Sequence, residues 1–200
     1  MNERTQPVTL INLFEVPAGA DEDFIAGWER ARDFLKSRDA YLDTALHQSL
    51  APDARFRFVN VGRYPSAEAF QTTISQTDFP GGHMPYPAHP AIYDVVRQDG
   101  AEAERPGAVV LINPFTVPAD ADEQFLPIWE AARDALREQQ GYLSTSLYRS
   151  LLPGADFRFV NIALWESPTA FQTATQQPGF RAVARMPFEA HPALYRVIRS

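Results

Sequence analysis

The chain has 200 residues, of which 45% are hydrophobic and 22% are charged, and its formal net charge is −7. This composition is typical of a globular protein, and an acidic chain without a Lys/Arg run argues against nucleic acid as a partner. The absence of cysteine excludes disulfides and thiolate chemistry. Neither an apolar signal segment nor an apolar run of roughly 18 residues is present, so we expect a cytoplasmic protein with no membrane partner.

The sequence contains an internal duplication, because residues 8–97 align with residues 109–199. Nearly identical segments begin at Leu10 and Leu111, at Phe56 and Phe157, and at Ala88 and Ala190. Residues 98–107 contain two Gly and one Pro but no large apolar side chain, which is typical of a linker. We therefore predict a first repeat at 1–97, a linker at 98–107 and a second repeat at 108–200.

Each repeat shows the same order of predicted elements. Residues 8–16 alternate as a strand does, and residues 21–37 carry an apolar stripe at helical spacing. The remaining elements of the first repeat are strands at 41–50 and 55–64, a helix at 66–76, a Pro-rich loop and a strand at 91–97. The order βαββαβ is that of the ferredoxin-like fold, in which both helices cover one sheet face.

The sheet face opposite the helices is also apolar in both repeats, with Ile11 and Val59 in the first and Ile112 and Val160 in the second. An apolar sheet face must be buried against another layer. We therefore predict an α+β protein of two ferredoxin-like repeats, packed sheet to sheet as an intramolecular α/β barrel. Pro114 lies within a predicted central strand, where it cannot donate to a ladder, and we expect a bulge there.

Polar side chains interrupt the helix-covered face of the predicted sheet. In the second repeat, Asn113 lies on the first strand and Asn161 on the third, and Trp165 follows on the same face. A buried amide without a partner costs about 1–3 kcal/mol. The two amides therefore either bond to each other and fix the strand register, or face a cavity.

The surrounding residues favour a cavity. Trp165 supplies an aromatic wall with an N–H donor, and the Pro-rich loop brings Arg185 and Met186 toward the same end. We expect Phe115, Phe159, Trp129 and Met186 to contact a small molecule there. The first repeat keeps Asn12 and Asn60 but has Tyr64 in place of Trp165 and His83 near the position of Arg185, so these four residues define either a second candidate cavity of different chemistry or a silent copy.

No His/Asp/Glu cluster has metal-ligand spacing, and no phosphate-binding or nucleophile-elbow motif occurs, so we expect neither a metal nor a nucleophilic triad. His89 and His191, each before a proline, are interpreted as structural residues.

The pattern resembles the antibiotic-biosynthesis monooxygenases, a family of small ferredoxin-like proteins that form dimeric α/β barrels. The resemblance covers both repeats, and it rests on Asn113, on the segment from Phe157 to Asn161 with Trp165 beyond it, and on Arg185. In members that oxidise aromatic polyketides, such residues line the pocket. The resemblance therefore implies that Asn113, Asn161, Trp165 and Arg185 are catalytic.

These relatives convert anthrones or phenols to quinones with dioxygen, without metal or flavin. The resemblance implies a cofactor-independent monooxygenase here, with a small aromatic substrate and dioxygen as partners. The repeats would pair within the chain, and a further homodimer is compatible with the sequence. No strong base is evident among the predicted site residues.

Four alternatives remain open. One is an oxygenase that opens rings with reduced flavin, and another is a polyketide cyclase on the same fold. A third is a haem-degrading enzyme, which is disfavoured because the position of the family's His ligand falls near Thr175 here. The fourth is a non-enzymatic ligand-binding module.

Overall fold

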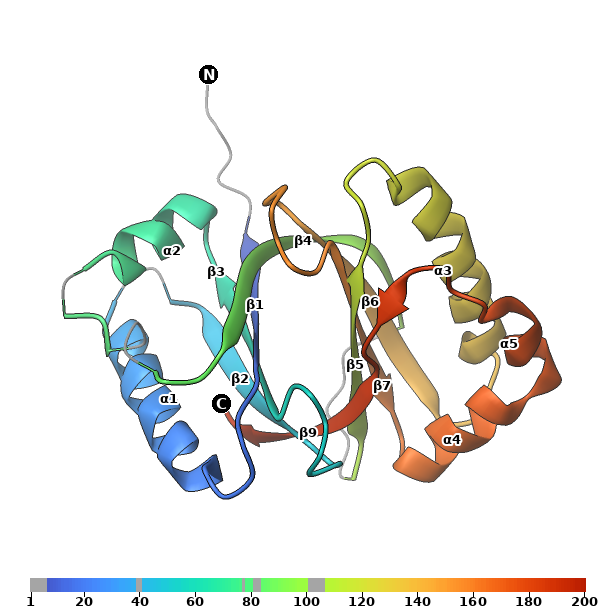
Figure 1. Cartoon of the computed structure of the whole chain (residues 1–200), viewed down its shortest axis with the longest axis horizontal. Coiled ribbons are helices and arrows are strands. Elements are labelled where there is room, and N and C mark those ends of the chain that lie inside the picture. The colour runs from blue at the N-terminus through green and yellow to red at the C-terminus, as the bar shows by residue number, and fades with distance from the viewer. Residues whose placement is uncertain (1–6, 39–40, 77, 81–83, 101–106) are drawn as a thin grey trace. The chain divides into compact units, whose positions relative to one another are not determined.

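The computed structural model describes residues 7–38, 41–76, 78–80, 84–100 and 107–200. The first repeat forms β1 (Val8–Phe14), α1 (Asp21–Lys36), β2 (Asp43–Ser49), β3 (Phe58–Tyr64), α2 (Ala67–Ile74) and β4 (Ala88–Gly100). The second repeat forms β5 (Val109–Thr116), α3 (Asp122–Arg137), β6 (Tyr142–Ser150), β7 (Phe159–Trp165), α4 (Pro168–Gln176), α5 (Pro178–Val183), β8 (Glu189–Ala190) and β9 (Ala193–Arg199). The predicted order βαββαβ is confirmed in both repeats, with one added helix in the second (Figure 1).

The sheet pairing is that of the ferredoxin-like fold. In the first repeat, β1 pairs antiparallel with β3 and with β4, and β3 pairs with β2. In the second repeat, β5 pairs with β7, β8 and β9, and β7 pairs with β6. The register places Asn12 opposite Asn60 and Asn113 opposite Asn161. The fold class is therefore α+β with two ferredoxin-like repeats, as the sequence predicts.

Helices cover one face of each sheet, and aromatic residues hold them there. On α1, Phe24 stacks on Phe58 with ring centroids 4.4 Å apart, and in the second repeat Phe125 stacks on Phe159 at the same separation. Such pairs contribute about 0.5–1.5 kcal/mol beyond the apolar area they bury. The same aromatic core thus fixes the first helix of both repeats.

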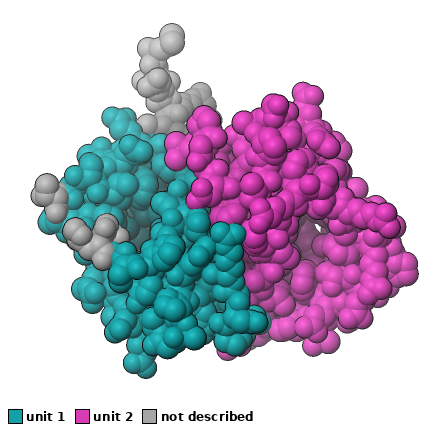
Figure 2. All heavy atoms as spheres, in the orientation of Figure 1, with its two compact units in different colours: residues 1–94, 197–200 teal, residues 95–196 magenta. Residues whose placement is uncertain are grey.

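The chain divides into two compact units, Met1–Asp94 with Val197–Ser200, and Val95–Arg196 (Figure 2). The end of β4 thus belongs to the unit of the second repeat, and the end of β9 to the unit of the first. Residues 98–100, which we expected in the linker, form the end of β4, because this segment packs within the unit built on the second repeat. The arrangement of the two sheets as a barrel stays a prediction.

Equivalent ion pairs fix the exchanged strand ends. In the unit of the second repeat, Arg97 of β4 bonds Glu130 of α3 at 2.6 Å. In the unit of the first repeat, Arg199 of β9 bonds Glu29 of α1 at 2.7 Å. Each unit is therefore completed by a segment that the sequence assigns to the other repeat.

Pro114 requires no bulge, contrary to our expectation. It lies opposite Val160 in a register between β5 and β7 that shows no shift. On the other edge of β5, β8 ends at Ala190 and β9 begins at Ala193, and His191 N–H donates to Pro114 O at 3.2 Å. Pro114, which has no N–H to donate, thus lies beside the gap between β8 and β9. In the first repeat the corresponding strand, β4, has no such gap.

Candidate functional site

A cavity of about 330 Å³ lies between the sheet and the helices of the second repeat. Most of its lining is apolar, as is typical of small-molecule sites, whose volumes are about 300–1,000 Å³. The polar side chains that line it are Asn113, Arg133, Tyr142, Thr145, Asn161, Thr175 and the indoles of Trp129 and Trp165. The surface of this unit is visibly hollowed in Figure 2. The polar side chains that interrupt the apolar sheet face therefore lie around a cavity that is partly open.

Asn161 is held in one orientation by two donors. Its Oδ1 accepts hydrogen bonds from Trp129 Nε1–H at 3.2 Å and from Thr145 Oγ1–H at 2.9 Å. Thr145 also lies 3.3 Å from Ile162 O. Because the amide oxygen is engaged on the protein side, the amide N–H₂ of Asn161 is left as the donor that can serve a guest in the cavity.

Two other buried polar atoms lie on the cavity wall, Asn113 Oδ1 and Trp165 Nε1. Neither has a hydrogen-bond partner among the described residues. Asn113 and Asn161 face each other in the register, yet no hydrogen bond joins their side chains. Trp165 is fully buried, with Tyr142 and Phe171 packed edge-on against its ring at 5.4 Å. An acceptor and a donor that are buried and unsatisfied beside a cavity are suited to a ligand that bonds both.

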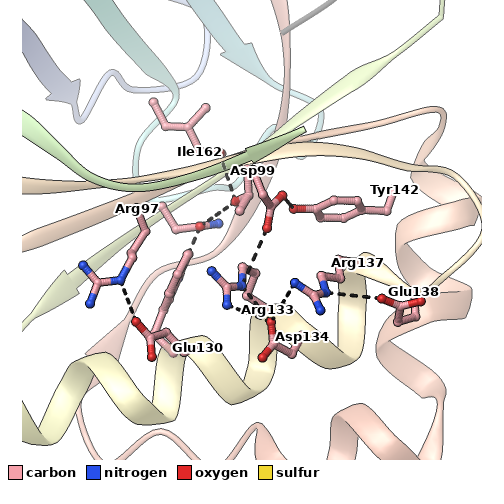
Figure 3. Close-up of polar contacts among 12 residues, drawn as sticks. Arg97, Asp99, Glu130, Arg133, Asp134, Arg137, Glu138, Tyr142 and Ile162 are labelled. Carbon is pink, nitrogen blue, oxygen red and sulfur yellow. Dashed lines mark hydrogen bonds and ion pairs between the residues drawn. The ribbon is translucent and has the colours of Figure 1, made fainter. Parts of the chain in front are cut away.

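Two members of a charged cluster, Arg133 and Tyr142, line the same cavity, and Figure 3 shows the contacts of this cluster. Arg133, on α3, lies over the Trp129 indole with its guanidinium carbon 5.4 Å from the ring centroid. Its Nε is 3.6 Å from Asp99 Oδ2, and Tyr142 Oη–H donates to Asp99 Oδ1. Burial raises the pKa of Tyr142, and the hydrogen bond to Asp99 raises it further. The cavity therefore has one cationic and one phenolic group on its wall.

The predicted residues of the second repeat divide into two groups. Asn113, Phe115, Trp129, Asn161, Trp165 and Met186 all line the cavity. Phe159 instead lies in the hydrophobic core against Phe125. Arg185 is exposed and is not part of the lining. It follows the end of α5, where Met186 takes the inward position, so the cation that lines the cavity is Arg133.

The first repeat has a corresponding cavity of about 310 Å³, which includes Asn12 and Asn60 as expected. Asn60 Oδ1 accepts from Trp28 Nε1–H at 2.8 Å and from Thr44 Oγ1–H at 2.7 Å. Tyr64 is buried in the adjoining core and does not line the cavity, and burial raises the pKa of its hydroxyl. His83 lies outside the described residues.

Among the polar residues that line the second cavity, sequence reasoning did not predict Arg133, Tyr142, Thr145 or Thr175 as site residues. A signal existed for Arg133, because it lies one helical turn after Trp129 and so shares its face. Thr145 lies opposite Ala163 on the neighbouring strand, which a predicted β6–β7 register would have shown. Asp99 had no such signal, because it was assigned to the linker.

In the ranges that the structure describes, no three His, Asp or Glu side chains gather as metal ligands do. None of the described helices is both long enough and apolar enough to span a membrane.

A family model described as antibiotic biosynthesis monooxygenase matches residues 108–186. Among curated proteins, none matches the sequence of this chain. A proposed monooxygenase from Shewanella loihica PV-4 is 45% identical, and the match covers 97% of that chain and 47% of this one, with a TM-score of 0.44.

Two further solved structures match. An anthrone oxidase-like protein has a TM-score of 0.78 at 14% identity, with 100% of this chain and 94% of that one covered, and it shares the fold. SnoaB, a cofactor-independent oxygenase from Streptomyces nogalater, is 28% identical over 47% of this chain and 96% of its own, with a TM-score of 0.42.

Proposed function

The chain belongs to the antibiotic biosynthesis monooxygenase family, and on that premise we propose that it is a cofactor-independent monooxygenase. Its substrate would be an electron-rich aromatic of the polyketide type, oxidised by dioxygen from anthrone or phenol to quinone. Membership of the family rests on the match of the family model to residues 108–186 and on the 45% sequence identity to the relative from Shewanella loihica PV-4.

The observation that carries the proposal is the set of oriented polar atoms in an apolar cavity. The amide N–H₂ of Asn161 is free to donate, and Trp165 Nε1–H and Asn113 Oδ1 have no partner in the described part of the chain. Preorganised donors stabilise an oxyanion as it develops, and losing one typically costs about 3–4 kcal/mol of activation free energy. A flat aromatic whose oxygen becomes anionic fits this arrangement.

The reaction balances without an external reductant. An anthrone loses a proton to give an electron-rich anion, which transfers electrons to dioxygen and forms a carbon–oxygen bond. One oxygen atom stays as the new carbonyl, and the other leaves as water with the two hydrogens of the former CH₂ group. The protein must bind the ring, stabilise its anion and exclude bulk water, and the largely apolar lining of the cavity suits this last role.

The first repeat supplies a second candidate binding site, since Asn60 is oriented by Trp28 and Thr44 as Asn161 is by Trp129 and Thr145. Tyr64 stands where the second repeat has Trp165, so that wall lacks an indole donor. We therefore place the reaction in the second repeat.

Oxygen uptake with an anthrone tests the proposal. Purified protein treated with a chelator should accelerate oxygen consumption on 1,8-dihydroxyanthrone and form the anthraquinone, without added flavin. Asn161→Ala should lower kcat by about 100-fold, as expected for one lost oxyanion donor. Asn60→Ala leaves the same two types of donor unpaired and is the matched control for stability.

The comparison of the two alanine variants locates the reaction. A larger loss of rate for Asn161→Ala than for Asn60→Ala, at equal thermal stability, assigns it to the second repeat. No acceleration over buffer with several anthrones would contradict the proposal. Activity that appears only after addition of reduced flavin would favour the ring-opening alternative instead.

A further inference from the structure

The charged cluster beside the second cavity contains a carboxylate, whereas no strong base was evident among the predicted site residues. Asp99 is the carboxylate of this cluster that Tyr142 contacts, and it lies at the end of β4, in the segment expected as the linker. Its Oδ1 accepts the hydroxyl of Tyr142, and its buried Oδ2 accepts no hydrogen bond within the described chain. Tyr142 and Arg133 line the cavity, and Asp99, which does not line it, contacts both of them (Figure 3).

We propose that Asp99, acting through Tyr142, accepts the proton that the bound phenol or anthrone loses. The inference rests on the proposed function, and it makes Asp99 a positioning and proton-accepting residue and Tyr142 the group that touches the substrate. The substrate's O–H or C–H bond breaks as its proton binds Tyr142 Oη. At the same time the hydroxyl proton of Tyr142 passes to Asp99 Oδ1, so that no proton is lost to solvent.

The charges in the cavity stay balanced during this transfer. Before it, Arg133 faces two carboxylates: its Nε is 3.6 Å from Asp99 Oδ2, and its Nη2 is 2.7 Å from Oδ1 of the half-exposed Asp134. Afterwards Asp99 is neutral, and the charge of Arg133 is available to the substrate anion in the cavity that it lines. An uncompensated buried charge is costly. The proposed transfer moves the negative charge from Asp99 to the substrate, both near Arg133, and creates no new charge, so it is favoured.

Tyr142 is suited to relay a proton and unsuited to hold a negative charge. Burial, with the hydrogen bond to Asp99, raises its pKa, so the hydroxyl gives up one proton only as it receives another. The charged groups around the pair are Arg133 and Arg137 of α3, Asp134 bonded to Arg133, and Arg97 of β4, which is bonded to Glu130. Neither of the two carboxylates among these groups, Asp134 and Glu130, contacts Tyr142.

The first cavity differs at this point. Tyr41 stands at the position of Tyr142, but it packs against the core cluster beside Leu35 and is not part of the cavity lining. Arg32, the counterpart of Arg133, bonds Asp33 as Arg133 bonds Asp134, but it donates to the backbone Ser200 O at 3.4 Å where Arg133 approaches Asp99. Within the described part of the first repeat, therefore, no carboxylate–tyrosine pair adjoins the cavity.

The experiment measures kcat and its pH dependence with 1,8-dihydroxyanthrone for the full chain. Asp99→Asn and Tyr142→Phe should each lower kcat by roughly 100-fold, which is within the usual range for general base catalysis, and should change KM only a few-fold. Both variants should lose the acid limb of the pH profile and gain activity as the pH approaches the pKa of the free substrate. The double variant should be no slower than either single variant, because the two residues act on one proton.

Glu130→Gln is the matched control, because it breaks the neighbouring ion pair between β4 and α3 and leaves Asp99 in place. It should keep the wild-type pH profile. Tyr142→Phe retains the ring that packs on Trp165, so the test stands even if Asp99→Asn unfolds. Variants that keep the wild-type rate and acid limb would overturn the role of Asp99 alone, whereas an inactive wild-type chain would overturn the proposed function and this inference together.

Discussion

The two amides of each repeat illustrate how one residue type takes two roles. Asn161 and Asn60 on the third strand of each repeat are fixed by an indole and a threonine hydroxyl, and each amide oxygen accepts both donors. Asn113 and Asn12 on the first strand are left with an unpartnered amide oxygen within the described residues. The first pair therefore supplies a rigid donor, and the second pair an acceptor that a guest can satisfy.

His47 gives a prediction about stability and pH at the residue scale. It is buried on β2, and burial lowers its pKa to about 4 from the usual 6.5, although its Nδ1 lies 3.2 Å from Val59 O. Between these pKa values the unfolded chain binds a proton that the folded chain does not, so stability falls as the pH drops from about 6.5 toward 4.

Urea unfolding at pH 7 and at pH 5 checks this. The wild-type chain should lose about 2 kcal/mol of its unfolding free energy over that interval through His47. In His47→Gln, which cannot titrate, this part of the pH dependence should disappear. An equal loss in both proteins would assign the effect to groups other than His47.

At the scale of the elements, the start of α1 shows what a sequence pattern misses. Asp21 is the first residue of this helix, the N-cap is Ala20, and no side chain caps the helix. The carboxylate of Asp21 instead binds Arg57 at 2.6 Å and accepts from Gln48 Nε2–H at 2.8 Å. The position near a helix start was predictable, whereas the partner came from a strand far along the chain.

Gly100 gives a prediction at the same scale. It ends β4 with φ +72°, and a Cβ there would lie 2.3 Å from the backbone oxygen of Leu143. Gly19 has a similar φ of +87°, but a Cβ there would meet nothing within 4 Å. Gly100→Ala should therefore lower the unfolding free energy by several kcal/mol, and Gly19→Ala by only about 1 kcal/mol.

The difference between the two alanine variants in denaturant unfolding isolates the contact between β4 and β6. Since Asp99 adjoins Gly100, the substitution Gly100→Ala should also lower kcat with 1,8-dihydroxyanthrone. Equal destabilisation by both substitutions would show that the backbone conformation, and not the close approach to Leu143, determines the cost.

At the scale of the whole molecule, the compact units and the sequence repeats have different boundaries. The unit of the second repeat begins at Val95, whereas the repeat in sequence begins near residue 108. A fragment of residues 95–200 should therefore have a higher Tm than a fragment of residues 107–200, because only the first retains the Arg97–Glu130 and Asp99–Tyr142 contacts.

The two fragments are compared by thermal unfolding followed by far-ultraviolet circular dichroism. The Tm of the longer fragment should be higher by several degrees, because about 1–2 kcal/mol of extra unfolding free energy raises the Tm of a unit of about 100 residues by that amount. Equal melting temperatures would show that the end of β4 adds no stability to this unit.

The sequence by itself determined the duplication, the order of elements and the amides of the site, because these follow from local periodicity and from polar residues on an apolar face. Tertiary structure decided which groups meet across the chain. It turned Arg185 outward, placed Phe159 in the core, and brought Asp99 of the expected linker onto Tyr142 of the second repeat. Side chains from distant segments meet only through packing and register, and no local pattern records either.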